Sequence, residues 1–201
     1  DDLDRSITVE EPQRVACLLG SFAQIWQLAG GEVGATADDA WDDLQLELAE
    51  DTVNLGGTKH LSLELLLSAK PDLILASTNT RQNVQWQETL ENTGIAVAYF
   101  DIDDFEDYLR LLKICTDILN TPQRYETYGT QLQAQIQSVV EAAAARENQP
   151  SILFVRAGSS AKVTKAKTAE NHFVCAMLKE LGTFNIAEKA PILLDGLSTE
   201  E

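Results

Sequence analysis

Short apolar runs alternate with amphipathic stretches along the first 120 residues of the chain. The apolar runs are nearly continuous, and they cover residues 14–19, 72–76 and 95–100. Such runs are typical of strands that are buried on both faces of a parallel sheet. Apolar residues also recur at helical spacing over residues 22–28, 63–67 and 105–119. This alternation, with short connections, predicts an α/β lobe in which helices cover a mainly parallel sheet.

One long helix is predicted after this lobe, over residues 121–148. Thr121 is a favourable N-cap, Pro122 suits the first helical position, and Pro150 marks the end. About 26 residues in a helix span roughly 40 Å, so we expect a rigid strut. The predicted parts of the chain are an N-terminal lobe over residues 1–120, an inter-lobe helix over residues 121–149 and a partial C-terminal lobe over residues 151–201.

The chain after the long helix echoes the chain before it. A buried strand, a loop of small residues and a helix that ends at a glycine occur on both sides. The segment Leu-Ser-Leu-Glu at 61–64 also has a counterpart, Leu-Ser-Thr-Glu at 197–200. Because only 51 residues follow Pro150, we expect the C-terminal lobe to be truncated. Chance similarity between short segments is the alternative.

The predicted sheet has four loops at the carboxyl ends of its strands, where ligands bind in open parallel sheets. The loops cover residues 20–22, 37–41, 77–80 and 101–103. Their candidate ligand-binding residues are Ser21, Phe22, Trp41, Ser77, Asn79 and Thr80. Trp41 stands in an acidic stretch, so it either stacks on a planar ligand or packs onto the sheet. The polar residues either orient a ligand or satisfy turns.

Residues 156–167 carry four of the chain's fifteen basic residues and no acid. The segment directly follows a predicted strand, where a ligand-binding loop is expected. Arg156, Lys162 and Lys165 are therefore candidate ligand-binding residues, and they would attract an anionic ligand. Arg156 can make planar, bidentate contacts. The alternative is a surface loop whose lysines face water.

The composition argues against several other classes of function. The chain has 32 acidic and 15 basic residues and a net charge of −17, which argues against a nucleic-acid partner. Its three cysteines are far apart and it has two histidines, so no metal site is predicted. The sequence contains no dinucleotide-binding, phosphate-binding or nucleophile-elbow motif. We therefore expect no catalytic residue and no cofactor. The alternative functional classes are a Rossmann-type enzyme and a sensor domain.

The order of the segments resembles the substrate-binding proteins of ABC importers for ferric siderophores, haem and vitamin B12. The resemblance is carried by RVACLL at 14–19, LSLE at 61–64, AKPDLILAS at 69–77, TGIAVAYFD at 93–101 and ILFVRAGSS at 152–160. It implies an α/β fold of two Rossmann-like lobes with mainly parallel sheets, joined by one long helix, with the ligand in the cleft between them. It also implies an extracytoplasmic location, in the periplasm or at the cell surface as a lipid-anchored protein; the sequence shows no signal peptide.

The resemblance further implies that the protein captures a small-molecule metal chelate, foremost a ferric siderophore, with cobalamin or haem as alternatives. Lys59 and His60 stand at a place that this family uses near its cleft, so both are candidate ligand-binding residues. A lone histidine is more often a hydrogen-bonded surface residue than a ligand. Haem would need an axial Tyr or His, and the candidates are Tyr99 and His60.

The implied partner is an ABC permease in the membrane, to which a monomeric binding protein delivers its ligand. In this family a glutamate on each lobe docks onto arginines of the permease. The matching residues are Glu64 and Glu200, the two glutamates that close the echoed segments. The alternative is that each is an acid in the first turn of a helix, where it stabilises the helix dipole.

Overall fold

The computed structural model describes residues 1–157 and 164–190 of the 201-residue chain. The chain divides into two compact units, Asp1–Gln131 and Leu132–Glu201, here called unit 1 and unit 2. Two residues that the sequence singled out, Lys162 and Glu200, lie outside the described residues.

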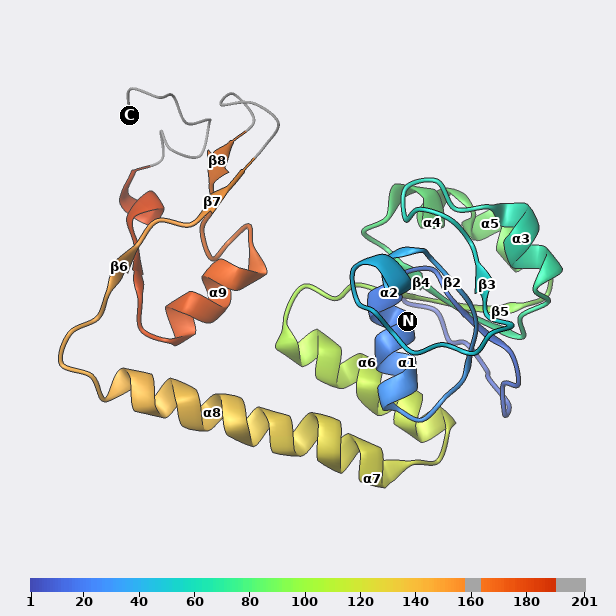
Figure 1. Ribbon diagram of the computed structural model, residues 1–201, viewed down its shortest axis with the longest axis horizontal. Coiled ribbons are helices and arrows are strands. Elements are labelled where there is room, and N and C mark those ends of the chain that lie inside the picture. The colour runs from blue at the N-terminus through green and yellow to red at the C-terminus, as the bar shows by residue number, and fades with distance from the viewer. Residues whose placement is uncertain (158–163, 191–201) are drawn as a thin grey trace. The chain divides into compact units, whose positions relative to one another are not determined.

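Unit 1 is built on a parallel sheet, and the three apolar runs of the sequence supply three of its strands (Figure 1). The strands are β1 (Val15–Cys17), β2 (Val33–Thr36), β3 (Val53–Asn54), β4 (Leu73–Ser77) and β5 (Ala96–Phe100). Within the described residues their order is β3-β2-β1-β4-β5, and every pairing among them is parallel. The predicted α/β fold with a mainly parallel sheet is therefore confirmed.

The pleat of the strands sorts the core of unit 1 into two clusters, because successive residues face opposite sides of a sheet. Val15 and Cys17 pack with α1 (Gly20–Leu28) and α6 (Phe105–Ile118). Ala16, between them, packs with α3 (Leu63–Ser68) and α5 (Gln87–Glu91) on the other face. Two short helices, α2 (Asp39–Asp42) and α4 (Arg81–Gln85), begin beyond the carboxyl ends of β2 and β4.

The N-terminal segment, residues 1–5, runs along the outer edge of β5. The Asp2 N–H donates to the Tyr99 carbonyl at 2.9 Å, and the Tyr99 N–H donates to the Asp1 carboxylate at 3.1 Å. The Arg5 guanidinium donates to the Val97 carbonyl at 2.9 Å. These bonds cover backbone groups that an open sheet edge would otherwise expose.

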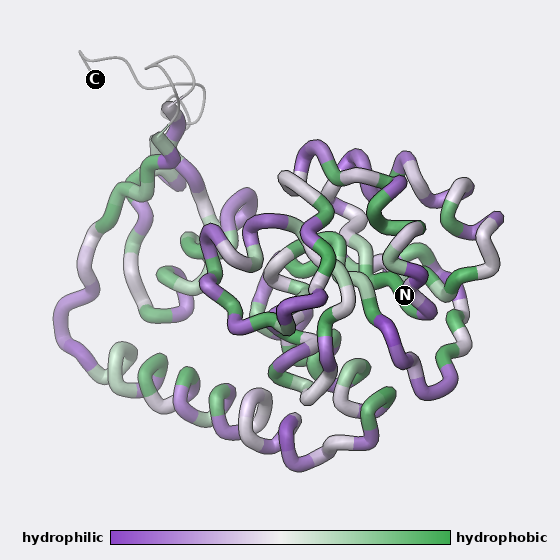
Figure 2. The backbone as a smooth tube through the Cα atoms, turned by 45° about the vertical axis from the view of Figure 1, so that its right-hand side comes forward, coloured by the Kyte–Doolittle hydropathy of each residue, from purple (hydrophilic) through white to green (hydrophobic). Residues whose placement is uncertain are grey.

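The long helix of the sequence analysis differs from the structure in three respects. It runs as α7 (Pro122–Tyr125), a π-helical turn η1 (Glu126–Thr130) and α8 (Gln131–Ala144), and so ends earlier than predicted. The Thr121 hydroxyl does not cap it but donates to the Ala29 carbonyl at 2.7 Å. The π turn coincides with a bond from the Tyr108 hydroxyl of α6 to the Tyr128 carbonyl at 2.9 Å. Hydrophobic and hydrophilic residues alternate along α8 (Figure 2).

Besides most of α8, the described residues of unit 2 contain two short strand pairs and one further α-helix. Strand β6 (Ser151–Ile152) pairs in parallel with β9 (Phe184–Asn185), and β7 (Val155–Arg156) pairs antiparallel with β8 (Lys165–Ala166). Helix α9 (Phe173–Glu180) and a 3-10 turn, η3 (Ile186–Lys189), complete it. The Asn185 amide donates to the Lys167 carbonyl at 2.7 Å, which links β9 to the segment after β8.

Candidate functional site

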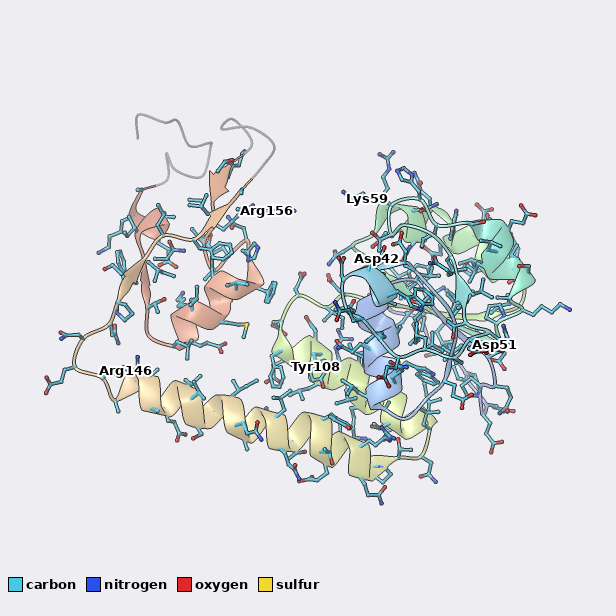
Figure 3. The ribbon with its side chains drawn as sticks, in the orientation of Figure 1. Asp42, Asp51, Lys59, Tyr108, Arg146 and Arg156 are labelled. Carbon is cyan, nitrogen blue, oxygen red and sulfur yellow. The ribbon has the colours of Figure 1, made fainter. Side chains whose placement is uncertain are left out.

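The parallel sheet of unit 1 brings its functional candidates to one edge. Because all its strands point the same way, the loops after β1, β2, β3, β4 and β5 share the carboxyl edge. Lys59, after β3, and Asp42, after β2, lie at this edge, whereas Asp51 precedes β3 at the opposite edge (Figure 3). The edge is thus made by segments that are far apart in the chain, from the one after Cys17 to the one after Phe100.

A pocket of about 770 Å³ opens at this edge, entirely within unit 1. It is lined by Leu19, Thr58, Lys59, Asn79, Thr80, Arg81, Gln82 and Gln85. Three residues that the sequence singled out, Lys59, Asn79 and Thr80, are among them. The lining combines two cationic side chains with three carboxamides and two hydroxyls, so it can offer many hydrogen-bond donors to a polar or anionic ligand.

The other candidates of unit 1 do not line this pocket. Phe22 is 2% exposed and packs in the core between α1 and the sheet. Ser77 is buried, and its hydroxyl accepts the Asn79 N–H at 3.1 Å, which satisfies the turn after β4. Ser21 and His60 are exposed, and Trp41, within α2, is half-buried.

Two amide side chains of α4, which the sequence analysis did not single out, organise the pocket. Gln82 Oε1 accepts the Leu61 N–H at 2.9 Å, and Gln82 Nε2 donates to the Leu61 carbonyl at 2.9 Å. Asn83 Oδ1 accepts the Ser77 N–H at 2.9 Å, and Asn83 is fully buried. The sequence signal that could have identified Gln82 and Asn83 was their position, since both lie within three residues of the end of the candidate loop at 77–80.

The turn from β1 into α1 depends on a glycine at the same edge. A Cβ on Gly20 would lie 2.6 Å from the Ala40 nitrogen, so only glycine lets α1 and α2 approach this closely. The Gly20 N–H donates to the Asp39 carboxylate at 2.9 Å. Burial, together with the charges of Asp38 and Asp43, raises the pKa of Asp39, although the Gly20 N–H partly opposes this.

An acidic loop, residues 101–103, follows β5 at the carboxyl edge of the sheet and accepts hydrogen bonds from Asn79. The amide nitrogen of Asn79 donates to the Asp101 carboxylate and, at 3.3 Å, to the Asp103 carboxylate. An ionised carboxylate can accept hydrogen bonds but cannot donate them. The contact therefore requires that the amide nitrogen of Asn79, and not its oxygen, faces the two carboxylates. Burial and the neighbouring charge of Asp103 raise the pKa of Asp101.

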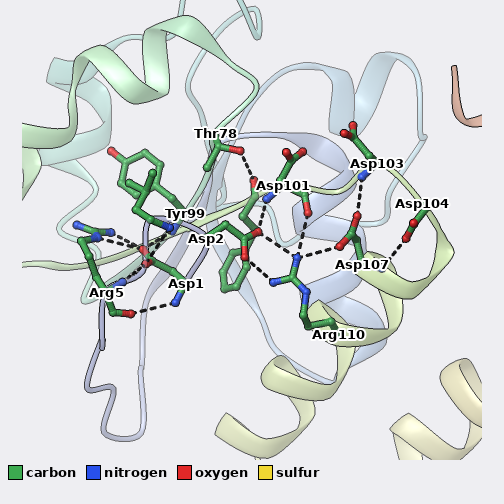
Figure 4. Close-up of polar contacts among 12 residues, drawn as sticks. Asp1, Asp2, Arg5, Thr78, Tyr99, Asp101, Asp103, Asp104, Asp107 and Arg110 are labelled. Carbon is green, nitrogen blue, oxygen red and sulfur yellow. Dashed lines mark hydrogen bonds and ion pairs between the residues drawn. The ribbon is translucent and has the colours of Figure 1, made fainter. Parts of the chain in front are cut away.

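This loop is in turn held by Arg110 of α6, which joins two carboxylates (Figure 4). Arg110 donates to Asp2 at 2.7 and 3.0 Å and to Asp107 at 3.0 Å. Asp2 accepts the Asp101 N–H at 2.6 Å, and Asp107 accepts the Asp103 N–H at 3.1 Å. Burial alone would raise the pKa values of Asp2 and Asp107, but their hydrogen bonds, those from Arg110 first, lower both.

The remaining candidates lie outside this edge. Arg156, labelled in Figure 3, is exposed in β7. It is paired in register with Lys165 of β8, so two basic residues stand opposite each other on one strand pair of unit 2. Glu64 is exposed in the first turn of α3, where the Ser62 hydroxyl caps the helix by accepting the Leu65 N–H at 3.2 Å.

Within residues 1–157 and 164–190, no group of three or more His, Cys, Asp or Glu side chains is arranged to hold a metal ion. In the same residues, no helix combines the length and the apolar character needed to cross a membrane.

Comparison with known proteins gives a consistent family. Residues 15–199 match the family described as periplasmic binding protein. A vitamin B12-binding protein of Pectobacterium atrosepticum is 29% identical over 161 residues, which are 78% of this chain and 56% of that protein. A second, from Pectobacterium carotovorum subsp. carotovorum, is 24% identical over 192 residues, 94% of this chain and 67% of that protein. The chain thus spans between about half and two thirds of the length of these relatives.

Solved structures share the fold. The periplasmic heme-binding protein RhuT from Roseiflexus sp. RS-1 superposes with a TM-score of 0.71 at 24% identity, covering 94% of this chain and 71% of its own. A TroA-like periplasmic binding protein from Xylanimonas cellulosilytica gives 0.75 at 20% identity, with coverages of 98% and 66%. The periplasmic vitamin B12 binding protein BtuF of Vibrio cholerae gives 0.70 at 16% identity, with coverages of 96% and 72%.

Proposed function

The chain belongs to the periplasmic binding protein family, and we propose that it is the extracytoplasmic substrate-binding component of an ABC importer. The family and the compared structures are binding proteins rather than enzymes. In our proposal the protein captures an iron compound, foremost a ferric siderophore, and delivers it to a permease in the membrane. The pocket at the carboxyl edge of unit 1 is the proposed ligand site.

The observation that carries the choice of ligand is the pair of cations in the pocket lining, Lys59 and Arg81. Ferric catecholates and carboxylates are anionic, and the guanidinium of Arg81 can bind neighbouring oxygens in a bidentate manner. The net charge of −17 repels anions at long range, so an anionic ligand needs such local cations. Arg156 and Lys165 of unit 2 remain proposed ligand-binding residues, because they pair in register on β7 and β8.

Haem binding receives less support from the structure. Tyr99, one of its two candidate axial ligands, is fully buried, and its hydroxyl donates to the Asn83 carbonyl at 3.0 Å. Burial raises the pKa of Tyr99 to about 12, so the phenolate that iron would need is disfavoured. His60 remains as an exposed candidate.

Tryptophan fluorescence tests the proposed ligand class. Titration with an anionic ferric tris-catecholate should quench the emission, and the double variant Lys59→Met with Arg81→Met should bind it about tenfold more weakly, because two partly solvated charge contacts are lost. Lys70→Met is the matched control, since Lys70 is exposed and lies before β4 at the opposite edge of the sheet. Preferential binding of haemin, cyanocobalamin or a neutral ferric tris-hydroxamate would contradict the anionic-chelate assignment.

Permease docking is proposed for Glu64 and, outside the described residues, for Glu200. Glu64→Gln should reduce ligand delivery to permease vesicles while leaving ligand affinity unchanged, because the side chain is exposed on α3 and does not line the pocket. Glu88→Gln is the control, since Glu88 is also an exposed acid in the first turn of a helix. If the two substitutions changed ligand delivery equally, the docking role of Glu64 would be refuted, and its role would be only to stabilise the dipole of α3.

A further inference from the structure

We propose that Gln82 is a positioning residue, which clamps the segment at residues 56–61 to α4 and so keeps Lys59 in the wall of the pocket. This inference rests on the proposed function, because it assigns to Gln82 a role in presenting a ligand contact rather than a contact of its own.

The clamp is a pair of hydrogen bonds to a single residue. Gln82 accepts a hydrogen bond from the Leu61 N–H and donates one to the Leu61 carbonyl, both at 2.9 Å. The side-chain amide thus pairs with the backbone of Leu61 as a residue of a neighbouring β-strand would. The two bonds fix the orientation of the Gln82 amide. If the amide were flipped, its nitrogen would face the Leu61 N–H and its oxygen would face the Leu61 carbonyl, and both bonds would be lost. Leu61 is 5% exposed, so water does not readily replace a lost partner.

The other backbone hydrogen bonds of the clamped segment do not involve α4: the Gly56 carbonyl accepts the Asp38 N–H at 3.1 Å, and the His60 N–H donates to the Gly57 carbonyl at 2.7 Å. The segment follows β3 (Val53–Asn54), a two-residue strand at the edge of the sheet. It contains Gly56, with φ +90°, and Gly57, and glycines leave the unfolded backbone unusually free. Within residues 1–157, the side-chain hydrogen bonds that join this segment to α4 are those of Gln82.

The clamp joins the two walls of the pocket. Thr58 and Lys59 line it from the clamped segment, whereas Asn79 and the α4 residues, including Gln82 itself, line it from the other side. If the clamp is removed, the segment and Lys59 must be ordered at the moment of ligand binding, which costs affinity. A loss of about tenfold is expected, the size that corresponds to ordering one or two long side chains.

The test compares Gln82→Met with Gln85→Met in the full chain. Gln85 lies one turn further along α4, lines the same pocket, and its side chain makes no hydrogen bond within the described residues. In Gln82→Met, amide hydrogen exchange should become at least tenfold faster over residues 57–62 and stay unchanged in β1 and β4, while Gln85→Met should leave all of them unchanged. Equal exchange in the two variants would overturn the clamp, whether or not any ligand binds.

Affinity for a ferric tris-catecholate then tests whether the clamp acts through Lys59. Gln82→Met should weaken binding about tenfold in the wild-type background and not at all in a Lys59→Met background, because the clamp has then nothing to position. Additive effects would refute the positioning role. Absence of binding to the wild-type chain would instead count against the proposed function, and the exchange measurement would still decide the clamp.

Discussion

Arg110→Met tests the network that holds the acidic loop at the carboxyl edge. Arg110 is the cation that joins Asp2 of the N-terminal segment to Asp107 of its own helix, and these two carboxylates accept the N–H groups of Asp101 and Asp103. Methionine keeps the aliphatic part of the side chain and its helix propensity, so the substitution removes mainly the charge and the hydrogen bonds. Asp2 and Asp107 are then left near further carboxylates without a cation.

The expected cost is about 1–2 kcal/mol of unfolding free energy at pH 7. Hydrogen bonds to charged groups contribute about 1.5–3 kcal/mol when buried, and exposed ion pairs about 0.2–1 kcal/mol. The Arg110 side chain is 40% exposed and its partners are 23% and 27% exposed, which places the network between those limits. Lys113→Met is the matched control on the same helix, because Lys113 and Asp117 are 51% and 62% exposed and should contribute only about 0.3–0.5 kcal/mol.

Urea unfolding followed by tryptophan fluorescence measures this difference, since Trp26, Trp41 and Trp86 all lie in unit 1 and the sequence has three tryptophans. The folded-state pKa values of Asp2 and Asp107 are lowered from the usual 3.8, so their contribution is present above that value and is lost as the pH falls through the lowered values. The gap between wild type and Arg110→Met should therefore be constant from about pH 7 to pH 5 and shrink below about pH 4.

The reasoning would be refuted by either of two results. The first is that Arg110→Met lowers the free energy of unfolding at pH 7 by no more than Lys113→Met does. The other is a gap between wild type and Arg110→Met that persists undiminished at pH values where both carboxylates are protonated.

The same unfolding assay checks two further substitutions. Gly20→Ala should cost about 1–3 kcal/mol, because its Cβ would lie 2.6 Å from the Ala40 nitrogen, whereas Gly57→Ala, with its nearest neighbour at 3.6 Å, should cost little; similar midpoints for the two would contradict the close approach. Tyr108→Phe should cost about 0.5–1 kcal/mol, because it removes a 2.9 Å hydrogen bond to a carbonyl of the π-helical turn, and an unchanged midpoint would show that this bond contributes nothing.

Much of the fold of unit 1 could be predicted from the sequence because its main signals are local. The apolar run at residues 72–76 becomes β4, buried on both faces. The helical stripe at residues 105–119 becomes α6, which begins where the Asp104 carboxylate accepts the Asp107 N–H at 2.9 Å. Once the strands are parallel, their carboxyl ends must share one edge, so the location of the candidate site follows from the order of the elements.

The lining of the site could not be predicted in the same way. Asn79 and Thr80 reach the pocket as their loop suggested, and Lys59 as the family resemblance suggested. Phe22, by contrast, turns into the core, and the Ser77 hydroxyl is used by its own turn. Phe22 falls in the first turn of α1, on the face that packs against the sheet. Which side chains near a strand end face a ligand therefore depends on tertiary packing that the local pattern does not reveal.

The sequence by itself determined the α/β class, the parallel strands and the edge at which a ligand would bind, because hydrophobic periodicity reports burial along one element at a time. Only the tertiary structure decided that Gln82 clamps Leu61, 21 residues earlier, and that Arg110 bonds to Asp2, 108 residues earlier. It also decided that a tyrosine of α6 meets the carbonyl of a π-helical turn. Such pairings join groups that are distant in the chain, and their partners exist only once the strands and helices have packed.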